Sequence, residues 1–219
     1  TPSSGSIYID RKQLYNFKQM GGRVGFLFQS PEESFFAQNV FDEVIYGFKN
    51  YIKKKDPGKE INEVFDMVGL DFEFFKKRNT YQLSLGEKRR VALASMLIFN
   101  PELLILDEFT LSLDGEGLRL FKSIISKLKR KKNIIVLISH DLDELFPLVD
   151  KIILINEGKI LFNGILKELF ENVDLLYESG LKPPQSVAMS GLLNKKGHLL
   201  PLDILDEKKA ASEIAKRCF

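Results

Sequence analysis

Four short apolar runs divide the chain into segments of different character. They are residues 24–28, 103–106, 134–138 and 152–155, with the sequences VGFLF, LLIL, IIVLI and IILI. Each run is continuous rather than alternating, which is typical of a strand buried on both faces of a sheet. Helical patterns over residues 117–130 and 142–149 lie between the later runs. Strands that alternate with helices predict an α/β chain with a parallel sheet and covering helices.

Residues 31–99 have a different pattern, without a clear buried strand. Helical periodicity covers residues 40–54, 61–68 and about 85–99, and Asn100-Pro101 closes the last of these. Residues 55–58, Lys-Asp-Pro-Gly, predict a turn inside this region. We therefore expect a helical insertion between two strands of the sheet. Beyond about residue 172 the pattern weakens, and a tail with a short helix near residues 207–216 is expected.

Composition and charge narrow the classes of protein to which the chain could belong. The 219 residues are 44% hydrophobic and 28% charged, with a net charge of +2. This balance excludes a disordered chain and argues against a dedicated nucleic-acid binder, which is usually strongly basic. The single cysteine, Cys218, excludes a disulfide scaffold and a thiolate metal cluster. No apolar run approaches the ~20 residues that span a bilayer, so a soluble intracellular protein is expected.

Polar residues with possible chemistry follow three of the apolar runs. Asp107 and Glu108 end the LLIL run, Gln29 follows VGFLF, and His140 stands just past IIVLI. Ligands of open α/β sheets bind beyond the carboxyl ends of the strands. There an aspartate and an amide oxygen could hold Mg²⁺, and the next acid could orient an attacking water. The alternative is that each strand simply ends in a polar loop.

Residues 84–87, Ser-Leu-Gly-Glu, form a second candidate site at the start of a predicted helix. Ser84 and Glu87 have the spacing of a capping box. The free N–H groups and the positive dipole end of such a helix make an anion site, and Gly86 would allow a phosphate to approach the backbone. The alternative is an ordinary helix cap.

In their order and spacing, these motifs resemble those of the ATP-binding cassette (ABC) ATPases. Residues 83–87 (LSLGE) resemble the signature LSGGQ, residues 104–108 the Walker B strand with its glutamate, and residues 112–114 the D-loop; Gln29 resembles the Q-loop and His140 the H-loop. The resemblance covers about residues 1–172 and implies a P-loop NTPase (RecA-like) fold. It implies a nucleotide-binding core over residues 1–30 and 100–172, a helical signature subdomain over 31–99, and a C-terminal extension over 173–219.

The resemblance also implies a role for each of these residues. The cofactors would be ATP and Mg²⁺, bound between two ATPase subunits in a head-to-tail dimer. The implied roles are as follows: Asp107 and Gln29 hold Mg²⁺, Glu108 acts as general base, His140 contacts the γ-phosphate, Ser84, Leu85, Gly86 and Glu87 meet the nucleotide held by the partner subunit, and Asp114 couples the two sites.

The sequence departs from the family pattern in two places. Leu85 replaces the first glycine of the signature and Glu87 its glutamine, so we expect crowding and extra negative charge near a phosphate. The phosphate-loop pattern GxxxxGK[ST] does not occur in the sequence. We therefore expect that the sequence begins inside the domain and that the chain as given binds ATP poorly and is inactive.

Residues 29–47, QSPEESFFAQNVFDEVIYG, resemble one branch of the family, the ATPases of energy-coupling-factor (ECF) importers for vitamins and transition-metal ions. Residues 180–184, with their Pro-Pro pair, resemble the same branch. The implied partners are a second ABC ATPase and an integral membrane scaffold subunit, with no nucleic acid, at the cytoplasmic face of the membrane. Phe35, Phe36 and Phe41 could contact that scaffold or could fill the core of the helical subdomain.

Two other functional classes compete with an importer ATPase. One is an ABC-type ATPase of DNA repair, chromosome maintenance or translation, but no sustained heptads or charged linker occur. The basic runs at residues 53–55 and 127–132 follow helical patterns and fit solvated helix ends better than a nucleic-acid patch. The other is a catalytically silent subunit, although Glu108 and His140 are both present.

Overall fold

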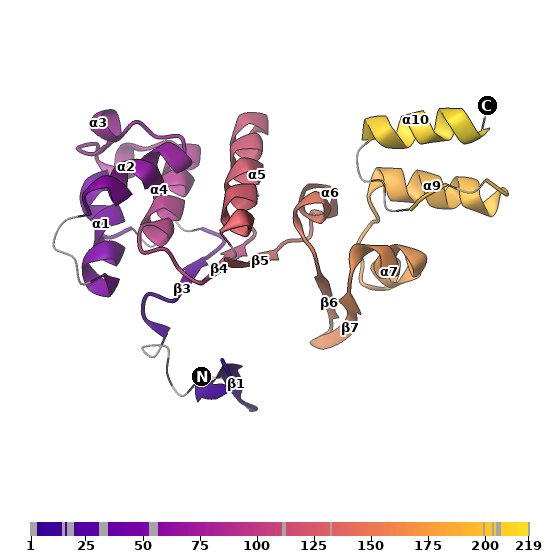
Figure 1. Cartoon of the computed structure of the whole chain (residues 1–219), viewed down its shortest axis with the longest axis horizontal. Coiled ribbons are helices and arrows are strands. Elements are labelled where there is room, and N and C mark those ends of the chain that lie inside the picture. Colours follow the sequence, from indigo (N-terminus) through magenta and orange to yellow (C-terminus); the bar gives the residue numbers. More distant parts are fainter. Residues whose placement is uncertain are drawn as a thin grey trace. The chain divides into compact units, whose positions relative to one another are not determined.

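The computed structural model describes residues 4–14, 16, 20–30, 35–52, 57–110, 113–131, 133–198, 200–202, 204 and 207–218. It separates into two compact units, residues 1–138 and 139–219, each described here by itself. Figure 1 labels most of their helices and strands. Within the described residues, no helix is long and apolar enough to cross a bilayer.

The first unit contains a parallel sheet of three strands. β3 (Val24–Leu27), β4 (Leu103–Asp107) and β5 (Ile134–Ile138) lie in the order β3-β4-β5. The crossover from β4 to β5 is α5 (Gly115–Arg130), which packs against β5. The predicted parallel sheet with a covering helix is confirmed for these three apolar runs.

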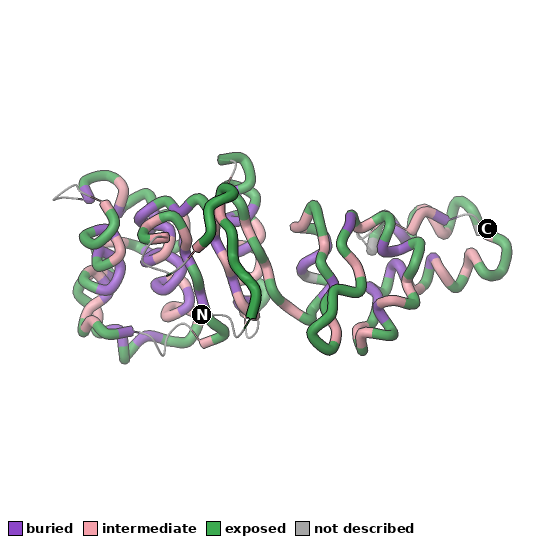
Figure 2. The backbone as a smooth tube through the Cα atoms, turned by 90° about the horizontal axis from the view of Figure 1, so that it is seen from below, coloured by how far each residue is buried: buried purple, intermediate pink, exposed green. Residues whose placement is uncertain are grey.

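The segment of the chain between β3 and β4 forms a layer of helices. It consists of α1 (Val40–Tyr51), α2 (Lys59–Met67), α3 (Phe72–Phe75), the 3-10 turn η3 (Thr80–Gln82) and α4 (Leu85–Leu97). α1 packs on α4 and α4 on β3, and the buried faces of these helices are purple in Figure 2. Val44, Phe48, Phe65 and Leu93 are almost inaccessible to solvent. The predicted helical insertion is present, while residues 53–56, with half of the predicted turn, lie outside the described residues.

The hairpin of β1 (Ile7–Ile9) and β2 (Lys12–Leu14) was not predicted. Its two turn residues, Asp10 and Arg11, have φ angles of 51° and 63°. Tight two-residue hairpins require positive φ, which Asn, Asp and Gly adopt most readily. With arginine at the second position, the sequence lacks the strong Asp-Gly signal.

The second unit gives the fourth apolar run a different environment from the predicted one. β6 (Ile152–Asn156) pairs antiparallel with β7 (Lys159–Gly164) through a turn at Glu157-Gly158. The run is a strand, as predicted, and the polar turn allows the chain to fold back directly into β7. Its place in the parallel sheet stays a prediction, because the parallel strands belong to the other unit. Ile153 and Ile155 are 57% and 63% exposed, so β6 is not buried on both faces.

Helices complete the second unit around one core. They are α6 (Leu142–Leu145), the 3-10 turn η4 (Phe146–Leu148), α7 (Leu166–Glu171), α8 (Asp174–Glu178), α9 (Gln185–Lys195) and α10 (Glu207–Cys218). Leu176 and Val187, which follow residue 172, pack in the same core as Phe146 and Leu154. The two compact units divide the chain at residue 138 and do not test the three-part division expected from the sequence, which stays a prediction.

β5 also departs from the expectation for a doubly buried strand. Ile134, Val136 and Ile138 are 64%, 40% and 46% exposed, whereas Ile135 and Leu137 between them are half-buried. Alternate residues of a strand point to opposite faces, so only one face of β5 is covered. A continuous apolar run cannot show which of its two faces has a neighbour.

Candidate functional site

The carboxyl edge of the sheet brings together three of the predicted site residues. Leu27 of β3 lies opposite Leu106 of β4, so Gln29 and the pair Asp107-Glu108 follow neighbouring strands at the same edge. Asp107 and Glu108 are half-buried and Gln29 is exposed. The parallel register therefore produces the side-by-side arrangement that the sequence predicted.

Glu108 has an uncommon backbone conformation. Its φ angle is 48°, and its N–H donates to the carbonyl of Ile138 at 2.8 Å. A non-glycine residue in the left-handed region costs on the order of 1 kcal/mol or more, and such residues are frequent at active sites. The hydrogen bond to the end of β5 fixes the backbone from which the carboxylate projects.

The oxygen atoms at this edge suit a magnesium ion that has only a few protein ligands. They do not form a site in which protein side chains supply every ligand. Among the described residues, no three His, Cys, Asp or Glu side chains are grouped so that they could hold a metal. Mg²⁺ commonly takes one or two carboxylates and leaves its other positions to water and phosphate oxygens. Asp107 and the Gln29 amide fit that donor set.

The start of α4 has the predicted capping box. The Ser84 hydroxyl accepts the Glu87 N–H at 3.3 Å, and the Glu87 carboxylate accepts the Ser84 N–H at 2.7 Å. Burial acts to raise the pKa of the Glu87 carboxyl, but the hydrogen bonds from Ser84 and the charge of Arg78 together hold it below its ordinary value. Gly86 has open space where a Cβ would stand, so the fold of the chain does not require glycine there.

A hollow between α4 and α5, of about 450 Å³, joins the two predicted binding motifs. Ser84, Leu85 and Gly86 line it from the start of α4, and Asp114 lines it from the start of α5. Asp114 caps α5 by accepting the Gly117 N–H at 2.7 Å. We call this space the α4–α5 hollow. Two helix starts therefore meet there, although Leu85 and Leu113 lie 28 positions apart in the sequence.

The two departures from the signature pattern differ in their surroundings. The Leu85 side chain is 43% exposed at the first turn of α4, and the crowding of a ligand there stays a prediction. Glu87 forms an ion pair with Arg78, at 3.0 Å between Nη1 and Oε1. The expected extra negative charge is therefore compensated by a residue that lies outside the predicted motifs.

Other predicted site residues are not placed relative to this edge. His140 is exposed and lies just beyond β5, in the second unit, so its position next to Glu108 stays a prediction. Ser112 of the D-loop motif and residues 31–34 after Gln29 lie outside the described residues.

The candidate partner surface near Gln29 contains one of the three predicted phenylalanines. Phe35 is buried, and Phe41 is half-buried against the ring of Phe72. Phe36 is 55% exposed, and its ring meets that of Tyr46 edge-on at 4.2 Å. We call Phe36 and Tyr46 the aromatic pair. The core alternative is therefore correct for Phe35, while Phe36 remains accessible.

Glu43 holds the backbone of this surface. Its carboxylate is buried and accepts the N–H groups of Phe36 and Ala37 at 3.2 and 2.9 Å. Burial raises the pKa of the Glu43 carboxyl, and the two hydrogen bonds only partly offset this effect.

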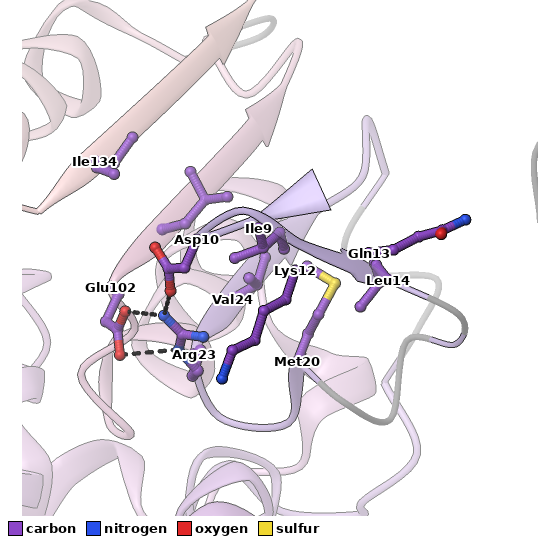
Figure 3. Close-up of a pocket in the computed structure, with 11 residues that line it drawn as sticks. Ile9, Asp10, Lys12, Gln13, Leu14, Met20, Arg23, Val24, Glu102 and Ile134 are labelled. Carbon is purple, nitrogen blue, oxygen red and sulfur yellow. Dashed lines mark hydrogen bonds and ion pairs between the residues drawn. The ribbon is translucent and has the colours of Figure 1, made fainter. Parts of the chain in front are cut away.

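A second cavity, of about 400 Å³, lies at the opposite edge of the sheet. Figure 3 shows Arg23 in contact with both Asp10 of the hairpin turn and Glu102 before β4, at 2.6 and 2.7 Å. The hydrogen bond from Arg23 lowers the pKa of the Glu102 carboxyl. The charged groups satisfy one another, so this cluster attaches the β1–β2 hairpin and is not a second candidate site.

A parallel α/β sheet with strand-end acids, a crossover helix and a helical layer is the architecture expected of the P-loop NTPase fold. Solved structures support this class. The chain superposes on cbiO1 of Clostridium perfringens, described as part of the ABC transporter complex cbiONQ, with a TM-score of 0.67, 29% identity and coverage of 88% of this chain and 77% of that one. An ATP-binding cassette dimer bound to ADP and Pi has the same fold, with a TM-score of 0.64, 23% identity and 75% coverage of each chain.

Sequence comparisons identify the family. The profile of the ABC transporter family matches residues 1–111. The energy-coupling factor transporter ATP-binding protein EcfA2 of Thermotoga maritima is 40% identical over 175 residues, which cover 79% of this chain and 65% of that protein. EcfA2 of Clostridioides difficile is 36% identical over 222 residues, 98% of this chain and 77% of that protein. The chain belongs to the ABC transporter family of ATP-binding proteins.

Proposed function

We propose that this chain is the ATP-hydrolysing subunit of an ECF-type importer for a vitamin or a transition-metal ion. One observation carries the proposal. The strand-end pair Asp107-Glu108 and the α4–α5 hollow occur in a chain that is 36–40% identical to two EcfA2 proteins. Both features belong to one compact unit of the structure.

In this proposal, the residues at the sheet edge act on the nucleotide. Asp107 and Gln29 would hold Mg²⁺, which neutralises phosphate charge when it is bound. Glu108 would accept a proton from the attacking water, and its strained, hydrogen-bonded backbone directs the carboxylate. His140 would donate to the terminal phosphate. Phosphoryl transfer depends mainly on such positioning and charge neutralisation.

The α4–α5 hollow would serve the nucleotide of a second ATPase subunit. Helix starts offer unpaired N–H groups to anions, and Ser84, Leu85 and Gly86 present such a start beside Asp114. We infer that the two subunits close on ATP, with Asp114 coupling the two sites. The partner is a second copy of this chain or a sister ATPase. The assay of ATP hydrolysis described below, carried out with each of these partners, distinguishes the two.

The aromatic pair is the proposed contact with a membrane subunit, which would place the protein at the cytoplasmic face of the membrane. Exposed aromatic rings are frequent anchors of protein interfaces. A variant with Phe36→Ala and Tyr46→Ala should bind the membrane subunit at least tenfold more weakly while its melting temperature stays within about 2 °C, since both rings are half exposed. Tyr177→Ala, which removes a ring 56% exposed in the second unit, is the matched control. Equal binding of all three proteins would refute this surface.

The test of the proposed reaction is ATP hydrolysis by the full-length protein, alone and with a candidate partner. Glu108→Gln should abolish turnover and keep ATP binding and dimerisation, since the amide cannot accept the proton. Glu157→Gln is the control, because Glu157 has the same φ angle of 48° but lies in the β6–β7 turn. Turnover that survives Glu108→Gln would show that Glu108 is not the base.

A further inference from the structure

Glu87 lies at a position where a negative charge should oppose the proposed function. It is the third residue of α4, in the turn whose start lines the α4–α5 hollow. The helix dipole favours anions at this end, and a fixed carboxylate there would repel a phosphate. The capping box does not require the charge, because glutamine satisfies it equally well.

Arg78 meets the Glu87 carboxylate from the segment before α4. Its Nη1 atom donates to Glu87 Oε1 at 3.0 Å, and the two side chains are only 34% and 19% exposed. The guanidinium also stands over the rings of Phe74 and Phe75, at 5.3 and 5.1 Å from their centroids. Rings stacked on the cation restrict its motion and limit its hydration, so this pair is stronger than an ordinary surface pair.

The backbone of Arg78 is fixed as well. Its carbonyl accepts the N–H of Val40 at the start of α1, and its N–H donates to the Phe75 carbonyl. Glu87 is fixed by its two hydrogen bonds with Ser84. Both partners are therefore held in position before any ligand arrives.

We propose that Arg78 is a positioning residue of the nucleotide-facing turn of α4, where it neutralises Glu87 and so allows this chain to have an acid in its signature motif. The inference rests on the proposed function, since it assigns a phosphate to this turn. Arg78 acts through Glu87 and does not itself line the α4–α5 hollow. The lowered pKa of the Glu87 carboxyl agrees with a paired carboxylate.

The test compares Arg78→Gln, the double variant Arg78→Gln with Glu87→Gln, and the wild type, each as full-length protein with its partner ATPase. Arg78→Gln should raise the ATP concentration at half-maximal turnover about two- to fivefold, the range expected for one charge near a helix start, with kcat unchanged. The double variant should restore the wild-type value, because a glutamine side chain in place of Glu87 keeps the capping box without the charge. Lys76→Gln is the control, because Lys76 is a cation in the same segment that pairs with Glu73.

A second measurement needs no nucleotide. Carbon NMR titration of the Glu87 carboxyl should show a higher pKa in Arg78→Gln than in the wild type or in Lys76→Gln. A double variant as impaired as Arg78→Gln would overturn the inference, because a purely structural role of Arg78 is not rescued by removing a charge. An unchanged Glu87 pKa, or unchanged ATP dependence of Arg78→Gln in an active enzyme, would overturn it too. If the wild type has no turnover but its Glu87 pKa is still lower than that in Arg78→Gln, the result contradicts the proposed function and not the pairing of Arg78 with Glu87.

Discussion

Gly47 lies within α1, which packs against α4, and its replacement by alanine tests how these helices pack. A Cβ at this position would stand 2.9 Å from the carbonyl oxygen of Ser95 and 3.0 Å from a ring carbon of Phe99. Alanine in a helix interior gains about 1 kcal/mol over glycine from propensity alone. Overpacking against a backbone atom costs about 1–3 kcal/mol, because the helices must separate. We expect Gly47→Ala to lower the free energy of unfolding by roughly 1 kcal/mol, the difference between the middle of that range and the propensity gain.

The matched control is the same substitution in α9. A Cβ on Gly191 would meet open space, so only the propensity gain applies. Gly191→Ala should therefore stabilise its unit by about 0.5–1 kcal/mol. The assay is denaturant unfolding of the wild type and both variants, with amide hydrogen exchange to assign each change to its own unit. If Gly47→Ala stabilises the protein as much as Gly191→Ala does, α1 and α4 accommodate the methyl group and the packing argument is refuted.

Three further changes probe other features of the structure. Ser84→Ala removes the hydroxyl that accepts the Glu87 N–H and should cost about 1 kcal/mol, or about 2–4 °C in melting temperature, whereas Ser84→Thr should cost less than half of that. If Ser84→Ala melts at the wild-type temperature, the cap contributes nothing. Glu43→Gln keeps an acceptor oxygen without the buried charge. Because burial raises the pKa of the Glu43 carboxyl above its ordinary 4.5, the folded state binds the proton more tightly and the wild type gains stability as pH falls through that raised value. The variant should therefore be more stable than the wild type at pH 7, and the difference should shrink toward pH 4.5; a pH-independent difference in chemical denaturation would exclude this account. Arg23→Gln should speed hydrogen exchange in the β1–β2 hairpin and leave the β3–β5 sheet unchanged, since exposed ion pairs stabilise only locally; unaltered hairpin exchange would show that the ion pairs do not hold it.

The fold was predictable from the sequence wherever a local pattern of apolar residues was enough to specify a helix or strand and its packing. The apolar runs at β3, β4 and β5 predicted the parallel sheet, and 3.6-residue periodicity predicted α1, α2, α4 and α5. The run at β6 looks the same but pairs with β7, because strand pairing depends on the turn at Glu157-Gly158 and not on the apolar run itself. β7 and the β1–β2 hairpin were missed because none of these strands contains an apolar run longer than three residues.

The candidate site likewise has features that were predictable from the sequence and features that were not. The capping box of Ser84 and Glu87 and the cap formed by Asp114 are local, so three or four residues of sequence contain all their partners. The contribution of Arg78 is not local in this sense. It lies nine residues before Glu87, beyond the 3-10 turn, and only the path of the chain brings the two side chains to 3.0 Å.

By itself the sequence determined which residue types can carry chemistry and where the longer helices and the strands with long apolar runs form, because caps, periodicity and residue type act over a few residues. Only the tertiary structure decided which of these residues meet. It joined the starts of α4 and α5 in one hollow, aligned Gln29 with Asp107 at one sheet edge, buried Phe35 while Phe36 stayed exposed, and compensated Glu87 with Arg78. Such contacts depend on how helices and strands pack across tens of residues, and short-range patterns do not encode that packing.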